Sequence, residues 1–170
     1  METSCKNNFN DVKKIDEPIK TIFNLPINKN YYHEFIFNKN DNVDNIFNKV
    51  VKDWESFYLN DKIESFVLIF NTKTLPTNIG LNYVFKMVSY VNKIKKMKKF
   101  NKNYNKLSGT VIYVENKNLR NLINILFKLS KPLSNVYLVE NINDLKTMVE
   151  CLKNNKDKLC YPNNVKILKP

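Results

Sequence analysis

The sequence predicts an α/β domain with a mostly parallel central sheet and helices packed against it. Apolar runs of strand length recur at 66–70, 110–114 and 136–139, and a continuous run of this kind is typical of a strand buried on both faces. The segments between these runs place their apolar residues at helical spacing. Strands that alternate with amphipathic helices are typical of a parallel sheet with right-handed crossovers.

The N-terminal part is expected to contribute a tail and two strands. Residues 1–17 are polar and aperiodic, which is typical of a flexible terminus. Segments 19–26 and 31–39 are rich in Ile, Phe and Tyr and are expected to be short strands. Because no linker interrupts the chain after the tail, residues 18–160 are predicted to form one domain, followed by an extension at 161–170.

The first predicted helix covers 41–61 and carries Trp54, the only tryptophan of the chain, on its apolar face. Core packing is the expected role of Trp54. Asp41 or Asp44 is expected to cap this helix, since a short polar side chain there accepts hydrogen bonds from the first backbone N–H groups. Further helices are expected at 80–99, 119–130 and 143–155, the last capped by Asn141 or Asn143, with an edge strand at 165–169.

The chain of 170 residues carries a formal net charge of +12, and Arg120 is its only arginine. Lysine binds phosphate as a flexible point charge, whereas the guanidinium fork of arginine suits base edges. This balance favours loose association with a polyanion over sequence-specific reading. Asparagine makes up about one residue in six, which indicates an AT-rich genome, so codon usage explains part of the lysine excess.

One segment, 93–106, is dense in lysine and also contains Phe100 and Tyr104. Lysines near a helix C-terminus stabilise the helix through its dipole, so a solvated helix end is one interpretation. The other is a polyanion-binding surface with aromatic rings for stacking, which makes weak, non-specific nucleic-acid binding the alternative function. The residues concerned are Lys93, Lys95, Lys96, Lys98, Lys99, Lys102 and Lys106.

The composition argues against several classes of enzyme. Gly80 and Gly109 are the only glycines, too few for a phosphate-binding loop or a dinucleotide fingerprint. His33 is the only histidine and follows two tyrosines, where packing is expected rather than the role of a catalytic base. No enzymatic activity, cofactor or metal is therefore expected.

Cysteine usage and the absence of long apolar runs lead to an expected location. Cys5, Cys151 and Cys160 are odd in number and include no closely spaced pair, which favours reduced thiols in an intracellular setting. The first twenty residues have no apolar core, unlike a signal peptide. No apolar run approaches the ~18 residues that span a bilayer, so a soluble protein is expected.

Polar side chains follow three of the predicted strands, where they are expected to share one edge of the sheet. Such a cluster suits a cation or a polar ligand. Ordinary strand-end polarity and helix capping account for the same residues, so both interpretations stay open. The residues are Asn71, Glu115, Asn116, Glu140 and Asn141.

The order of elements from 19 to 152 resembles the STAS fold of anti-sigma-factor antagonists. In that family a strand leads through a polar loop to a helix with an Asp-Ser-Ser-Gly-Leu motif, and phosphorylation of the serine releases a partner. Residues 77–81 stand at the matching place. Gly80 and Leu81 match, whereas Asn78 and Ile79 replace the two serines. The resemblance implies a STAS-like fold, but the switch serine is absent.

The segment 65–141 also resembles STAS-like or CRAL-TRIO-like proteins of large DNA viruses and some protists. The shared features are the pattern SFVLIFNT, a long lysine-rich helix, and the run GTVIYVENKNLRNLINILFKLSKPLSNVYLVEN. This resemblance implies a small α/β fold and a viral source, and it implies no activity.

These observations lead to the hypothesis of a non-enzymatic protein-interaction or structural module, located in a virion or in the host cytoplasm. A protein partner is expected to dock on the loop and helix that begin at Asn71. Thr77 is the hydroxyl nearest the helix start and the weak candidate for a phospho-switch. The expected interaction loop comprises Asn71, Thr72, Thr77, Asn78, Gly80 and Tyr83.

Overall fold

The computed structural model describes residues 30–154 and 160–170, and the predicted tail at 1–17 and strand at 19–26 lie outside these ranges. The described strands form one sheet in the order β1-β2-β3-β4-β5, parallel throughout except for β5. The predicted α/β class with a mostly parallel sheet is therefore confirmed. The strands are β1 (Asn30–Ile36), β2 (Ser65–Asn71), β3 (Leu107–Tyr113), β4 (Asn135–Val139) and β5 (Lys166–Leu168).

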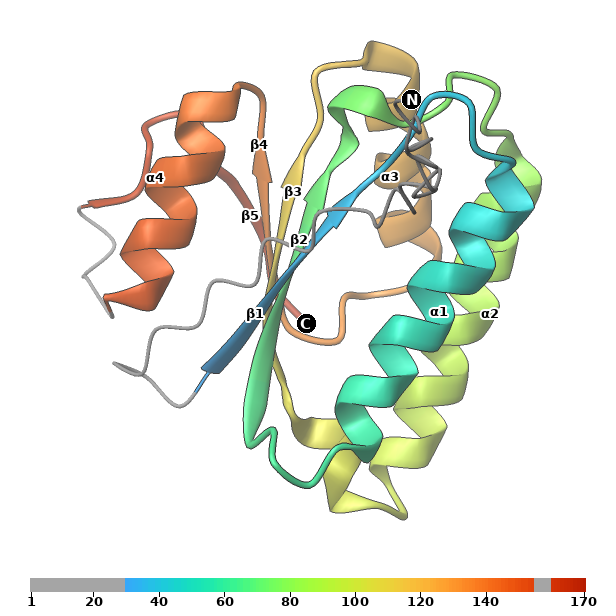
Figure 1. Cartoon of the computed structure of the whole chain (residues 1–170), viewed down its shortest axis with the longest axis vertical. Helices are drawn as coiled ribbons and strands as arrows, with labels where there is room; N and C mark the ends of the chain where they lie inside the picture. The colour runs from blue at the N-terminus through green and yellow to red at the C-terminus, as the bar shows by residue number, and fades with distance from the viewer. Residues whose placement is uncertain (1–29, 155–159) are drawn as a thin grey trace, which may run out of the picture.

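Of the α-helices in the described residues, three cover one face of the sheet and the fourth covers the other (Figure 1). Because β1 to β4 follow one another across the sheet in chain order, each right-handed crossover returns on the same side. The last helix precedes an antiparallel strand and is free of that constraint. The helices are α1 (Val43–Leu59), α2 (Leu81–Lys98), α3 (Lys117–Leu129) and α4 (Ile142–Lys153), with short 3-10 helices η1 (Thr72–Thr74) and η2 (Lys102–Asn105).

Asparagine side chains cap α1, α3 and α4. Asn42 caps α1 by accepting hydrogen bonds from two backbone N–H groups of the first turn, so the prediction of Asp41 or Asp44 is wrong. Asp44 lies inside the first turn, where a negative charge favours the helix dipole. Asn116 caps α3, and Asn141 caps α4 as predicted. Part of the abundant asparagine in this chain therefore serves to cap helices.

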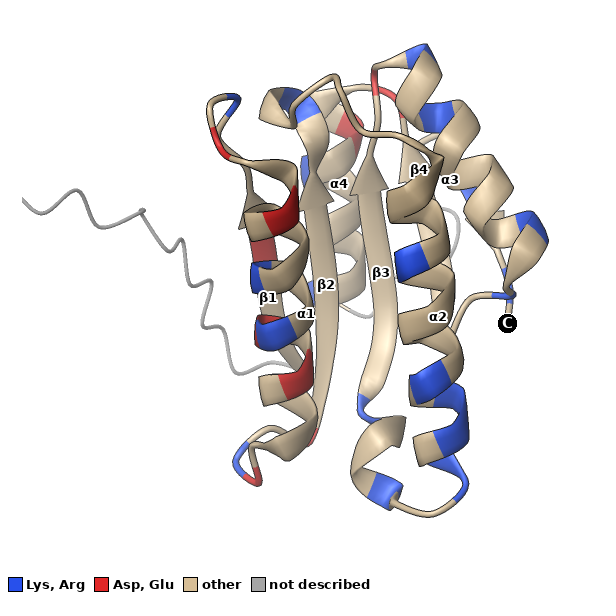
Figure 2. Ribbon diagram, turned by 90° about the vertical axis from the view of Figure 1, so that its right-hand side faces the viewer, with Lys and Arg blue, Asp and Glu red and all other residues tan. Residues whose placement is uncertain are grey.

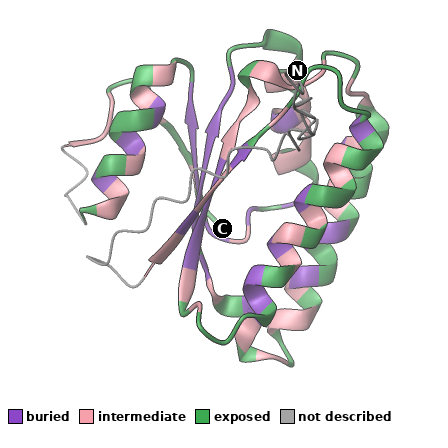
Figure 3. Cartoon of the chain, viewed as in Figure 1, coloured by how far each residue is buried: buried purple, intermediate pink, exposed green. Residues whose placement is uncertain are grey.

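The central strands are buried on both faces, as their apolar runs predict. In β2, four consecutive residues from Phe66 to Ile69 are buried. Phe66 and Leu68 pack with the apolar side chains of α1 and α2, whereas Val67 and Ile69 belong to the cluster under α4. Figure 3 shows the buried residues along the strands and on the inner sides of the helices.

Two aromatic residues occupy the places expected from the sequence. Trp54 is 6% exposed, and its indole Nε1 donates to the hydroxyl of Tyr58 at 3.2 Å. The ring of His33 packs against Phe35 and Phe57, with centroids 4.5 and 4.8 Å apart. Both residues therefore serve packing.

The C-terminal segment 161–170, set apart as an extension in the sequence, contributes β5 to the sheet. Its residues 166–168 pair antiparallel with β4, which confirms the predicted edge strand.

Candidate functional site

A cavity of about 210 Å³ lies between the sheet and helices α1, α2 and α3. Its volume exceeds the ~150 Å³ of an engineered apolar cavity that stays dry and binds benzene. The walls are apolar or aromatic apart from Thr72, Thr110, Ser130 and Lys131. This cavity is suited to an apolar group, and the sequence pattern did not predict it.

Most of the half-exposed residues that line the cavity lie near the carboxyl edge of the parallel strands, so the cavity opens mainly there. Its inner wall includes the buried residues Val84, Ile123 and Val136. The half-exposed lining residues concentrate in the first turns of the helices and in the loops near the strand ends. Open α/β sheets commonly hold ligands outside this edge. These residues include Phe37, Ile46, Phe47, Leu75, Ile79, Tyr83, Leu119 and Leu122.

The side of α2 that bears Leu81, Phe85 and Asn92 is in contact with the end of α3 at its C-terminal part and exposed at its start. Leu81, Phe85 and Asn92 recur on one side of α2, and the Asn92 carbonyl Oδ1 accepts from Ser130 Oγ, just after α3, at 3.2 Å. Toward the start of α2 the same side is uncovered, since Leu81 is 48% and Phe85 58% exposed. On α3, only Ile123 of the apolar face is fully buried.

The predicted interaction loop divides into a structural part and an exposed part. Asn71 Nδ2 donates to Glu34 Oε1 at 3.1 Å, and its Oδ1 accepts from the first turn of η1. Thr72 Oγ1 donates to the carbonyl of Tyr113 at 2.5 Å. These two residues join the loop to β1 and β3, which is a structural role.

The exposed part of the loop lies next to the cavity. Thr77 and Asn78 are exposed, and Gly80 begins α2 as an N-cap without a side-chain hydrogen bond. Between them, Ile79 lines the cavity together with Leu75. The sequence-based prediction did not include Leu75 and Ile79 as site residues. The signal that could have found them is the presence of two apolar residues in an otherwise polar loop.

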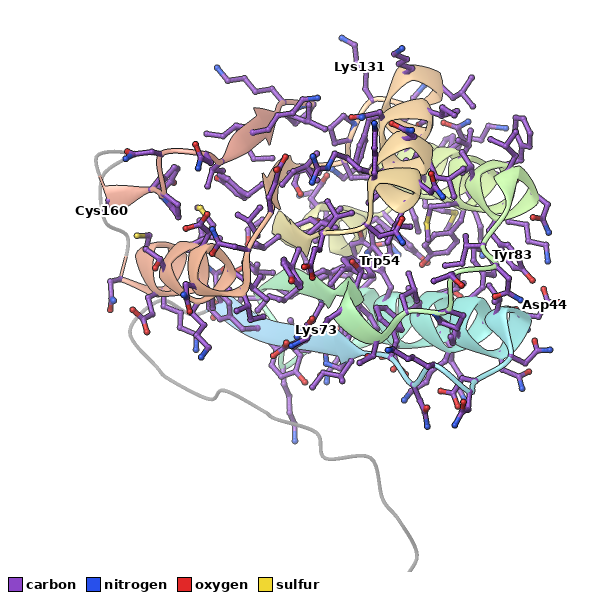
Figure 4. The ribbon with its side chains drawn as sticks, turned by 90° about the horizontal axis from the view of Figure 1, so that it is seen from above. Asp44, Trp54, Lys73, Tyr83, Lys131 and Cys160 are labelled. Atoms are coloured by element: carbon purple, nitrogen blue, oxygen red, sulfur yellow. The ribbon has the colours of Figure 1, made fainter. Side chains whose placement is uncertain are left out.

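Tyr83 connects the loop to α1. Its ring lines the cavity and lies beside Asp44 at the outer end of α1, while Trp54 lies deeper, between α1 and α3 (Figure 4). Lys86 Nζ stands 4.9 Å from the Tyr83 ring centroid and 2.7 Å from Asp44 Oδ1. Partial desolvation and the Asp44 carboxylate raise the pKa of Tyr83. This group holds the first turns of α1 and α2 together at the mouth.

The two glutamates that follow buried strands have separate partners. Tyr113 OH donates to Glu115 Oε2 at 2.8 Å, whereas Arg120 Nη1 pairs with Glu140 Oε1 at 2.8 Å. The adjacent Asn116 and Asn141 are helix caps. Among the described residues no group of His, Cys, Asp and Glu is arranged to hold a metal ion. The structure favours the capping interpretation of this edge.

Four lysines of the 93–106 run are engaged within the molecule. Lys93 pairs with Glu55 at 2.9 Å. Lys95 Nζ donates to Ser130 Oγ, Lys98 Nζ donates to the carbonyl of Leu133, and Lys106 Nζ donates to the carbonyls of Tyr58 and Asn60. Burial lowers the pKa of both Lys95 and Lys98. The run therefore serves first to join α2 to α1 and to the segment after α3.

The remaining lysines of the run, Lys96, Lys99 and Lys102, are exposed. The two aromatic residues also separate: Tyr104 is buried and stacks on Tyr58, whereas Phe100 is 86% exposed. Of this run, one aromatic ring and three exposed lysines are therefore available at the surface to a binding partner, fewer than the sequence indicates.

Comparison with protein-family models, curated proteins and solved structures gives no match. Across residues 30–154 and 160–170, no helix has the length and apolar character to cross a membrane. The cavity and the exposed side chains around it are therefore the features from which a function is inferred.

Proposed function

We propose that this protein is a non-enzymatic interaction module whose protein partner places an apolar group in the cavity beneath residues 75–83. The observation that carries the proposal is the cavity of about 210 Å³, with apolar walls and an opening beside the exposed loop. Aromatic and aliphatic anchors that fill such pockets supply most of the binding energy at protein interfaces. A virion or the host cytoplasm is the setting supported by the resemblance to viral proteins.

The surroundings of the opening support a protein partner. Leu81 and Phe85 expose apolar side chains one turn apart on α2, and Thr77 and Asn78 add exposed polar groups. An apolar centre with a polar rim is the usual anatomy of an interface. The polar lining residues are two threonines, a serine and a lysine, so the part of the wall formed by the described residues holds no carboxylate or imidazole for acid–base chemistry.

Filling the cavity tests the proposal. Leu122→Phe adds volume to a half-buried lining residue, whereas Leu129→Phe, on the same helix but 51% exposed and outside the cavity, is the matched control. We expect affinity purification from nuclease-treated cells that express the tagged chain to recover a partner with wild type and with Leu129→Phe. Leu122→Phe should reduce that recovery by about tenfold, as the loss of one interface anchor does.

A second pair of variants tests the rim. Leu81→Gln combined with Phe85→Gln should lose the same partner, whereas Leu59→Gln, 60% exposed at the far end of α1, should retain it. Circular dichroism melts establish that each variant is folded. Equal recovery of every protein by wild type, the filled variant and the rim variant would rule out this function.

A further inference from the structure

The end of α2 and the turn after it form a tip with one exposed aromatic ring. Phe100 is 86% exposed, the highest value among the large apolar side chains of the described residues. The turn is ordered by hydrogen bonds, since the N–H groups of Phe100 and Asn101 both donate to the carbonyl of Met97, at 3.0 and 2.9 Å. Beyond it, Tyr104 is buried against Tyr58. The ring of Phe100 is therefore held outward by a braced turn.

Positive charge surrounds this ring. Lys96, Lys99 and Lys102 are exposed, and within the described part of the chain no hydrogen bond or ion pair engages their ammonium groups. The sequence from residue 66 to residue 114 contains no acidic residue. Figure 2 shows the basic residues gathered on the last turns of α2 and the turn that follows.

A second apolar side chain lies at the same end of the molecule. Leu59, the last residue of α1, is 60% exposed. Lys106 Nζ donates to the carbonyls of Tyr58 and Asn60, on either side of Leu59, so the end of α1 is bound to the segment after Phe100. The tip, as a surface, consists of Leu59, Lys96, Lys99, Phe100 and Lys102.

We propose that this tip docks on an anionic membrane surface, with the Phe100 ring entering the interface and the three lysines contacting lipid headgroups. An apolar side chain surrounded by lysines is complementary to an anionic membrane, since the bilayer interior is apolar and its headgroups are negatively charged. Single-stranded nucleic acid is bound instead by several rings along a basic groove. Among the described residues of the tip, Phe100 is the one exposed ring, because Tyr104 is buried.

The tip is independent of the cavity mouth. α2 starts at the carboxyl edge of the sheet, where the cavity opens, and ends at the opposite edge (Figure 1). A partner at the mouth and a membrane at the tip therefore do not compete for the same surface, and variants of one leave the other intact.

Vesicle co-sedimentation at physiological salt tests the docking. We expect the full chain to sediment with vesicles of phosphatidylcholine and phosphatidylserine at least about tenfold better than with phosphatidylcholine alone, because each lysine near an anionic surface contributes. Phe100→Ala should weaken binding to the anionic vesicles about tenfold through lost apolar burial. Leu129→Ala, at an apolar residue that is 51% exposed and belongs to α3 rather than to the tip, should leave binding unchanged.

Charge is tested by a matched triple change. Lys96, Lys99 and Lys102 changed together to Gln should abolish sedimentation with anionic vesicles. The same change in net charge at Lys49, Lys128 and Lys146, exposed lysines elsewhere, should reduce it far less. Phe100→Trp in a Trp54→Phe background reports depth, since its emission should shift to the blue and be quenched by brominated lipid.

The outcomes separate the alternatives. Absent sedimentation of wild type with anionic vesicles, or binding that Phe100→Ala leaves unaltered, overturns the proposal. Tighter binding to duplex DNA than to anionic vesicles at the same salt, insensitive to Phe100→Ala, also overturns it and assigns the lysines to nucleic acid. The Phe100→Trp variant supports membrane docking only if its emission both shifts to the blue and is quenched by brominated lipid. Emission that is neither shifted nor quenched on sedimented vesicles contradicts insertion of the ring.

Discussion

At the scale of single residues, Trp54 both packs in the core and lines the cavity. Its indole donates to Tyr58 and packs edge-on against Tyr90, with centroids 5.4 Å apart, while part of the side chain lines the cavity. The amphipathic pattern of α1 places Trp54 toward the core, but it does not reveal that the core is hollow beside it. A buried aromatic residue thus contributes both to stability and to the binding surface.

Replacement of this side chain should be costly. We expect Trp54→Ala to lower the free energy of unfolding by about 3–5 kcal/mol, as large-to-small aromatic changes in cores do. Trp54→Phe keeps an aromatic ring and should cost less. Urea denaturation followed by circular dichroism measures both, and a midpoint for Trp54→Ala equal to that of wild type would show that the side chain carries no packing energy.

Buried tyrosines should make the fold sensitive to alkali. Burial raises the pKa of Tyr58 and Tyr90, and burial together with the Tyr137 hydroxyl raises the pKa of Tyr161 to about 12. In the unfolded chain tyrosine ionises near pKa ~10. Because the folded-state values are higher, the contribution of these groups to stability is complete below about pH 10 and is lost as the pH rises through their folded-state pKa values.

Absorbance at the tyrosinate band, recorded against pH alongside circular dichroism, checks this linkage. The last tyrosines should ionise only as the helical signal is lost. Ionisation of all nine tyrosines near the ordinary value in a chain that stays folded would contradict the assigned burial.

At the scale of elements, α3 illustrates how local and long-range effects combine. Its strongly amphipathic sequence predicts a helix with one buried face. In the structure that face is only partly buried: Ile123 is its buried residue, and Ser130, just after the helix, donates a hydrogen bond to Asn92 of α2. A helix with few buried contacts depends more on its own cap and propensity than a fully packed one.

The cap of α3 should therefore matter measurably. Asn116→Ala removes the hydrogen bond that Asn116 Oδ1 accepts from the Leu119 N–H at 3.1 Å, and we expect a loss of about 1 kcal/mol in unfolding free energy. Asn118→Ala, an exposed change two residues later inside the same helix, should stay within about 0.5 kcal/mol of wild type. Urea midpoints that move equally for the two variants would contradict a capping role.

At the scale of the whole molecule, the positive charge is unevenly used. The formal charge of +12 favours polyanions at low salt, but Lys95, Lys98 and Lys106 are occupied by oxygen atoms of the protein itself. The run therefore offers fewer free ammonium groups than its sequence indicates. With a single arginine, the chain also has few side chains suited to recognising the edges of bases.

Nucleic-acid binding should be weak and insensitive to sequence. We expect binding to DNA at low salt that is mostly lost at physiological salt, with a slope of about −0.9 per duplex phosphate contact in log K against log salt. Lys96, Lys99 and Lys102 changed to Gln should flatten that slope without altering the melting temperature. Lys95→Gln and Lys98→Gln should instead lower the melting temperature, since they remove internal hydrogen bonds. Tight, sequence-dependent binding at physiological salt would contradict this view.

The sequence by itself determined the α/β class, the buried strands at 66–70, 110–114 and 136–139, the order of the helices, and the burial of Trp54. These properties are recorded in periodicities of a few residues, because burial selects apolar side chains at every strand or helix position that faces the core. Only the tertiary structure determined that a cavity exists and which lysines of the 93–106 run are engaged in internal contacts. The cavity exists where three helices and the sheet fail to close, and Lys95 is engaged because Ser130, 35 residues away, lies within hydrogen-bonding distance. Contacts between segments so far apart leave no local pattern, so a lysine that faces solvent and one that joins two elements have the same appearance in the sequence.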